Sequence, residues 1–146
     1  ISNFYAMDQD PLSIEEARRS LSEIKIDFIT DSILSIIKRS VKINQPLDFI
    51  YSAGLFDYLN DKLARKLLSA TFDLLAPGGS MLIANFAPGL TEQAYMEAFM
   101  DWHLIYRDEF EMEALLKDIA QTETDSIKIY RDPMENVVYM EVRRKK

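Results

Sequence analysis

Short apolar runs alternate with stretches of helical periodicity along the chain. Apolar residues over 2–7 suit a short buried strand, and apolar and polar positions alternate over 24–29. "PLDFIYSAG" and "SMLIANF" indicate two further strands, the first bounded by Pro46 and Gly54. "SIKIYRDPMENVVYMEVRR" predicts two alternating strands around a turn at 132–136.

Helix signals fill the stretches between these strands. Ser13 and Glu16 have the spacing of a capping box that opens a helix running through Ser22. Four stretches place apolar residues at helical spacing: "TDSILSIIKRS", "NDKLARKLLSATFDLLAPGG", "TEQAYMEAFMDW" and "DEFEMEALLKDIA". Asn60 is a cap signal for the second of them, which Pro77, Gly78 and Gly79 should end, and Asp108, three residues ahead of Glu111, is a cap signal for the fourth. This alternation predicts an α/β fold with a mostly parallel sheet covered on both faces and a carboxyl-terminal antiparallel hairpin.

Composition narrows the class of protein. The 146 residues, 48% of them hydrophobic, are the size of one domain, so we expect a single domain over 1–146. The net charge of −7 disfavours binding to nucleic acid or to membrane surfaces. The sequence has no Cys, which excludes disulfides and thiolate metal sites, and we expect a cytoplasmic protein without a metal.

Doubly wound sheets bind ligands beyond the carboxyl ends of their strands, so residues that follow the apolar runs are candidates. Asp8 could accept hydrogen bonds from both hydroxyls of a ribose, or it could only shape a turn before the next helix. Asp31 could accept an adenine amino group or cap a helix. Position in the sequence does not separate these alternatives.

The stretch "YSAGLFDYLND" follows the third predicted strand. Ser52, Ala53 and Gly54 are small and let a ligand approach the backbone, while Phe56 and Tyr58 bring aromatic surface to the same loop. The stretch therefore predicts the floor of a cleft. The alternative is a glycine turn whose aromatic side chains belong to the core.

Five segments, in their order and spacing, resemble the later motifs of class I S-adenosylmethionine-dependent methyltransferases: "MDQDP", "ITDSIL", "DFIYSAGLFDYL", "LLAPGGSMLIANF" and "YMEAFMDWHLIYR". The combination of "SAGLFDYL", "IANF" and "MDWHLIYR" is similar to a bacterial group described as extracellular-factor or 3-hydroxypalmitic acid methyl ester biosynthesis methyltransferases. The resemblance implies a Rossmann-like fold. It also implies S-adenosylmethionine as cofactor and a small-molecule methyl acceptor, with a carboxylate or acyl-type metabolite as one expected class.

The family's first strand and glycine-rich loop would precede Ile1, and the sequence lacks both. The resemblance thus implies the carboxyl-terminal part of a longer catalytic domain, with a gap in the sheet between the strand ending at Met7 and the strand ending near Ser52. A partner or a rearranged pairing is the alternative way to fill this gap. We expect the chain alone to bind the cofactor poorly, and we expect unpaired strand edges to favour a homo-oligomer.

The resemblance also assigns residues position by position. Those implied for the cofactor are Asp8, Gln9, Asp31, Ser32, Ile33, Ser52, Ala53 and Gly54. Those implied for the methyl acceptor are Phe56, Tyr58, Asn85, Phe86, Trp102, Tyr106 and Arg107.

Several roles stay open at this point. Arg107 would either pair with an anionic group of the acceptor or be an exposed residue on a packed helix. Asp57 is a better-placed candidate base than His103, although it could equally orient its turn. A non-catalytic methyltransferase-like domain for binding or oligomerisation is the alternative function, and a nicotinamide-dependent oxidoreductase fits the motifs less well.

Overall fold

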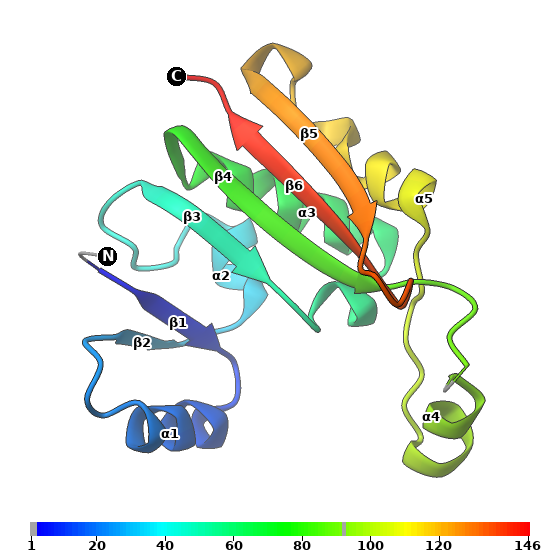
Figure 1. The fold of residues 1–146 in the computed structure, drawn as a ribbon. Helices are drawn as coiled ribbons and strands as arrows, with labels where there is room; N and C mark the ends of the chain where they lie inside the picture. The colour runs from blue at the N-terminus through cyan, green and yellow to red at the C-terminus, as the bar shows by residue number, and fades with distance from the viewer. Residues whose placement is uncertain (1–2, 92) are drawn as a thin grey trace. The chain divides into compact units, whose positions relative to one another are not determined.

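The computed structural model describes residues 3–91 and 93–146, and the chain divides into two compact units, residues 1–42 and 43–146. The first unit contains β1 (Tyr5–Asp8), α1 (Pro11–Ser20), β2 (Asp27–Thr30) and α2 (Ile33–Ile37) (Figure 1). β1 and β2 are parallel, with Tyr5 opposite Asp27 and Asp8 opposite Thr30. The predicted strands are therefore present with shifted bounds, and Ser2, predicted in the first of them, lies outside the described residues.

The start of α1 differs from the prediction. The Asp10 carboxylate accepts the backbone N–H groups of Leu12 at 3.1 Å and Ser13 at 3.0 Å, so Asp10 is the N-cap and Pro11 opens the helix. The capping box predicted at Ser13 and Glu16 is wrong, because Ser13 already lies in the first turn and its hydroxyl donates to Asp10 at 2.7 Å.

The second unit is built on a four-stranded mixed sheet. Its strands are β3 (Leu47–Ser52), β4 (Leu75–Phe86), β5 (Thr124–Arg131) and β6 (Val137–Arg144), in the order β3-β4-β6-β5. β3 and β4 are parallel, whereas β6 is antiparallel to both β4 and β5. The predicted hairpin is confirmed, but the sheet is mixed rather than mostly parallel because the hairpin joins β4 through an antiparallel strand.

The helices of this unit are α3 (Asp61–Asp73), α4 (Gln93–Met100) and α5 (Glu109–Ala114). The Asn60 cap is confirmed, since its side chain accepts the N–H of Leu63 at 3.0 Å. α5 has a complete capping box between Asp108 and Glu111 and continues as a short 3-10 helix, Leu115–Asp118. Within the described ranges, no helix has the length and apolar character needed to cross a membrane.

The junction of α3 and β4 also departs from the prediction, which ended the helix at Pro77, Gly78 and Gly79. α3 ends at Asp73, and β4 begins at Leu75 and runs through these three residues. A Cβ at Gly79 would lie only 2.9–3.1 Å from the carbonyl oxygens of Leu47, Ala76 and Asp48. Glycine therefore lets β3 and β4 approach closely here instead of stopping a helix.

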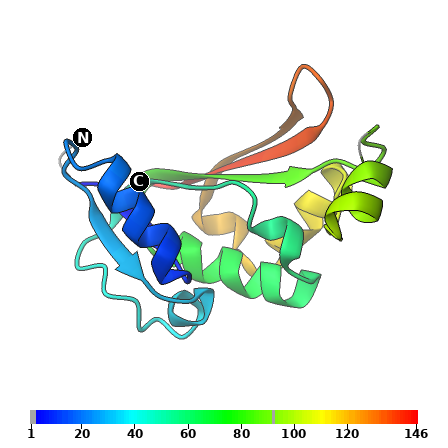
Figure 2. The same ribbon diagram turned by 90° about the horizontal axis from the view of Figure 1, so that it is seen from below.

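The core of the second unit lies between the sheet and the helices α3 and α5, which Figure 2 shows on one face of the sheet. Alternate residues of β4 and β6 face this core because strand side chains alternate between faces. The strand residues Met81, Ile83, Val138, Met140 and Val142 are each at most 1% exposed. The intervening residues of the two strands, such as Ala84 and Tyr139, lie on the opposite face of the sheet.

The strands form two separate sheets. β1 pairs with β2 and β3 pairs with β4, and no ladder joins β1 to β3 among residues 3–91 and 93–146.

Candidate functional site

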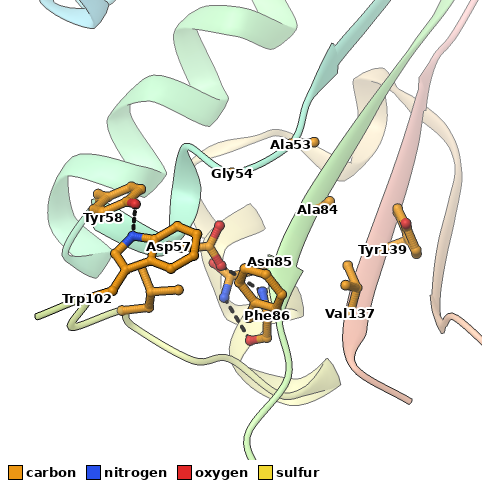
Figure 3. A pocket seen from close by; sticks show the side chains of 11 residues that line it. Ala53, Gly54, Asp57, Tyr58, Ala84, Asn85, Phe86, Trp102, Val137 and Tyr139 are labelled. Carbon is orange, nitrogen blue, oxygen red and sulfur yellow. Dashed lines mark hydrogen bonds between the residues drawn. The ribbon is translucent and has the colours of Figure 1, made fainter. Parts of the chain in front are cut away.

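A pocket of about 280 Å³ lies beyond the carboxyl ends of β3 and β4 (Figure 3). These strands are parallel, so their carboxyl ends meet at one edge of the sheet, where such folds bind ligands. The pocket is lined by Ala53, Gly54, Asp57, Tyr58, Ala84, Asn85, Phe86, Trp102, Leu104, Val137 and Tyr139.

Six residues that the sequence singles out for the cofactor or the acceptor line this pocket: Ala53, Gly54, Tyr58, Asn85, Phe86 and Trp102. The role assigned to each of them stays a prediction. Sequence reasoning missed the contribution of β6, because Tyr139 and Val137 reach the site only through their pairing opposite Ala84 and Phe86 of β4.

The loop after β3 leaves the floor of the pocket open. Gly54 has a φ of +77°, a conformation that glycine adopts most readily, and a Cβ built there would meet no atom within 4 Å. At Gly54 the loop therefore leaves room that a side chain would otherwise fill.

Asp57 is the one carboxylate in the described lining of the pocket. It lies in the 3-10 helix Phe56–Tyr58, is 2% exposed, and its Oδ1 accepts the N–H of Phe86 at 2.6 Å. Burial raises the pKa of this carboxyl, while the Phe86 hydrogen bond and the charge of Arg107 pull the pKa the other way. The result is a fixed carboxylate that holds its proton more readily than an exposed Asp.

Arg107 is 1% exposed and lies outside the pocket lining, contrary to both sequence-based alternatives. Its Nη1 donates to Phe56 O at 2.8 Å and to Asn85 Oδ1 at 2.9 Å. Its Nη2 donates to Leu59 O at 2.5 Å and to Asp61 at 2.9 Å, and its Nε donates to Asp61 at 3.2 Å. All five N–H groups are engaged within the chain, so an anionic acceptor has no free donor there.

Asn85 belongs to the same network. Its Nδ2 donates to Ile105 O at 2.9 Å and to Phe86 O at 3.0 Å, while its Oδ1 accepts from Arg107. Since Asn85 is 1% exposed, its side chain holds the segment after β4 in place at the edge of the pocket.

Aromatic side chains form the outer part of the pocket. The Trp102 indole N–H donates to the Tyr58 hydroxyl, and the Trp102 and Phe86 rings meet edge to face with centroids 6.5 Å apart. Figure 3 shows the Tyr58–Trp102 pair beside the Asp57 carboxylate. These contacts give the pocket a mainly apolar wall.

Three other candidates lie outside the lining. Phe56 is 1% exposed and belongs to the core. The Tyr106 hydroxyl is buried without a hydrogen-bond partner in the described part of the chain, and burial raises its pKa. His103 is exposed, with its Nε2 3.1 Å from Asp101 Oδ1.

The first unit places its predicted residues at the carboxyl ends of β1 and β2. Asp8 is exposed and its Oδ1 accepts the N–H of Asp10 at 2.8 Å, as a turn would require. The Asp31 N–H donates to Asp8 O at 3.0 Å, so both carboxylates lie at one edge of this sheet. Ser32, and not Asp31, caps α2, since its hydroxyl accepts the N–H of Leu34.

Three further cofactor candidates fall at the ends of elements. Gln9 is exposed directly after β1, Ile33 is the first residue of α2, and Ser52 is the last residue of β3, paired with Ile83. Each of the three therefore lies at or directly after the carboxyl end of a strand or at the start of the following helix, and their role in cofactor binding stays a prediction.

Neither a family model nor a curated protein matches this chain. Solved structures do match. A possible exported protein from Bordetella parapertussis is 15% identical with a TM-score of 0.75, covering 99% of this chain, which spans only 54% of that protein.

Two methyltransferases match over the same range. N-methyltransferase NodS from Bradyrhizobium japonicum WM9, in complex with S-adenosyl-L-homocysteine, is 16% identical with a TM-score of 0.67, covering 99% of this chain and 67% of NodS. Magnesium protoporphyrin IX methyltransferase from Synechocystis PCC 6803, with bound S-adenosylmethionine, is 13% identical with a TM-score of 0.65. The match covers 98% of this chain and 60% of that methyltransferase. The chain is therefore similar in structure to class I S-adenosylmethionine-dependent methyltransferases, with an α/β Rossmann-like fold, a mixed sheet and antiparallel carboxyl-terminal strands.

Proposed function

We propose that the protein transfers a methyl group from S-adenosylmethionine to a small-molecule acceptor, and that this chain is the carboxyl-terminal part of the catalytic domain. The observation that carries the proposal is the pocket beyond β3 and β4, which combines an open glycine loop with aromatic walls and one carboxylate. Similar folds hold S-adenosylhomocysteine or S-adenosylmethionine in solved structures.

The residues present fit such a cofactor in chemical terms. Asp8, exposed at the end of β1, offers a carboxylate oxygen to the hydroxyls of a ribose, and Asp31 and Ser32 lie at the same edge for an adenine, with Gln9 and Ile33 nearby. In the second unit, the room above Gly54, with Ser52 and Ala53 before it, suits the methionine end.

When bound, the cofactor supplies an electrophilic methyl group. The chain's own contribution is to hold the acceptor in line with that group and to keep water away from it, which reduces the entropy cost of the displacement. In this proposal the pocket residues Tyr58, Phe86 and Trp102 take that role, whereas Phe56, Tyr106 and Arg107 lie outside the lining. The family resemblance also implies a carboxylate or acyl-type acceptor. The described lining contains no basic side chain that could bind a carboxylate, so it does not support this class of acceptor.

Titration calorimetry with S-adenosylhomocysteine tests the proposal on this chain and on a form extended upstream. We expect binding to the extended form, weakened about tenfold or more by Asp8→Ala through the loss of charge-assisted hydrogen bonds. Asp27→Ala is the matched control, because Asp27 is exposed at the opposite end of the same small sheet. Equal effects of the two substitutions would count against the assigned ribose contact.

The second candidate is a methyltransferase-like domain without catalysis, used for binding or for forming a homo-oligomer. The two separate sheets favour it, because unpaired strand edges recruit partners. Absence of S-adenosylhomocysteine binding in both forms, together with a mass that rises with concentration in sedimentation, would support this candidate over the enzyme.

A further inference from the structure

The charge of the pocket is negative. Asp57 lines it, and the described lining contains no Lys, Arg or His. Arg107 lies behind the pocket, but its Nε and Nη2 are bonded to the carboxylate of Asp61. Two carboxylates and one guanidinium leave one negative charge, and Asp57 is the member of this group that faces the pocket.

The pocket walls suit a cation with an apolar body. The rings of Tyr58, Phe86, Trp102 and Tyr139 line the same pocket as Asp57. Figure 3 shows those of Tyr58, Phe86 and Trp102 near the Asp57 carboxylate and that of Tyr139 farther away, on β6. An ammonium group within about 6 Å of an aromatic ring is attracted by the negative face of the ring. An anionic group would instead be placed beside a buried carboxylate, at a cost that grows as water is excluded.

The Asp57 carboxylate is also held in one orientation. Its Oδ1 accepts the Phe86 N–H at 2.6 Å, and its backbone oxygen accepts the Ile105 N–H at 2.7 Å. The 3-10 turn is closed by the Tyr58 N–H, which donates to Leu55 O at 3.1 Å. A carboxylate fixed in this way loses little conformational entropy when it binds a hydrogen-bond donor.

We propose that this pocket binds a small amine with an apolar body as the methyl acceptor, and that Asp57 binds its ammonium group and takes its proton. This inference rests on the proposed function for the identity of the reaction. The ammonium gives one proton to the Asp57 carboxylate and becomes a free amine. The nitrogen lone pair then forms the N–C bond to the sulfonium methyl group, and the electron pair of the broken C–S bond stays on sulfur.

Burial supports this role because it raises the pKa of Asp57 and so strengthens the carboxylate as a base. The product is a methylammonium ion, and the proton on Asp57 passes to solvent when the pocket opens to the next acceptor. No metal or protein nucleophile is needed at any step.

The experiment uses ¹⁵N-labelled chain, whose single Trp provides one indole N–H signal within the pocket. Benzylamine, a cation at neutral pH, and benzoate, an anion of similar size, are titrated separately while the Trp102 Nε1–H signal is followed. We expect benzylamine to shift this signal to saturation and benzoate to leave it unchanged over the same concentrations. Asp57→Asn should weaken benzylamine about tenfold while keeping an oxygen for the Phe86 N–H.

Asp118→Asn is the control, because it removes the same charge from a carboxylate that pairs with Arg65 outside the pocket. The proposal is overturned if benzoate shifts the signal as well as benzylamine does, if neither ligand shifts it, or if the two Asn variants lose affinity equally. Failure of the proposed function is seen separately, as absent S-adenosylhomocysteine binding in the extended form. If the amine binds but the cofactor does not, the amine site is supported and the proposed methyl transfer is refuted.

Discussion

Replacing Arg107 by Met tests whether the buried guanidinium holds the loops around the pocket. Met fills similar space but donates no hydrogen bond. The substitution leaves two acceptors without any donor, Leu59 O and the Oδ1 of Asn85, a residue that is 1% exposed. Phe56 O also loses a donor but keeps the Leu59 N–H at 3.1 Å. Asp61 also loses its partner, but its side chain is 76% exposed and water can replace the bond.

The expected loss follows from these contacts. A buried acceptor left unsatisfied costs about 1–3 kcal/mol. Two such acceptors, at about 2 kcal/mol each, give a loss of about 4 kcal/mol. Because whole domains are stable by only about 5–15 kcal/mol, this loss would be large.

Urea unfolding followed by Trp102 fluorescence measures the effect in the second unit. With a slope of about 2 kcal/mol/M, a loss of about 4 kcal/mol lowers the midpoint by about 2 M. Arg65→Met is the matched control, since its ion pair with Asp118 is similar in length, 2.8 Å, but 37% and 42% exposed. Exposed pairs contribute little, so we expect a much smaller shift. Equal shifts in the two variants would refute the reasoning.

Three further changes test other parts of the structure. Gly79→Ala should lower the urea midpoint and disturb the β3–β4 ladder, because its Cβ would lie 2.9–3.1 Å from three backbone oxygens; unchanged amide exchange in β3 would contradict this. Asp10→Ala should speed amide exchange in the first turn of α1, where the cap bonds are lost. The Arg131 hydrogen bonds lower the pKa of Glu109 from 4.5 to about 2, so its stabilising effect is complete above pH 4.5 and is lost as the pH falls toward 2. The difference in urea midpoint between wild type and Glu109→Gln should therefore shrink over that interval, and a constant difference would show that the ion pair is not responsible.

Much of the fold could be predicted because its signals are local. The Asn60 cap, the Asp108–Glu111 capping box and the hairpin turn each need only a few neighbouring residues, and all three are present. The predictions failed where a distant strand decides the outcome. The local sequence predicts that Gly79 ends a helix, yet Gly79 lies within β4. Glycine is needed there because the carbonyl groups of β3 pass too close for any side chain.

The position of the pocket could be predicted for a similar reason. Parallel strands end at one edge, so the residues after β3 and β4 had to meet there. Tyr139 could not be predicted, because its place depends on the pairing of β6 with β4, which alternation alone does not specify. Nothing local in the sequence indicates which residue of the hairpin lies opposite Ala84.

What each polar residue does at that edge follows from whether its bonds are already made within the chain. Buried polar groups are almost always satisfied, so an Arg or Asn after a strand can hold a loop as readily as it can bind a ligand. Arg107 and Asn85 are bonded on all sides and therefore serve the structure first. Asp57 has one oxygen tied to Phe86, a raised pKa and a place in the pocket lining, so it is the group whose chemistry remains open to a ligand.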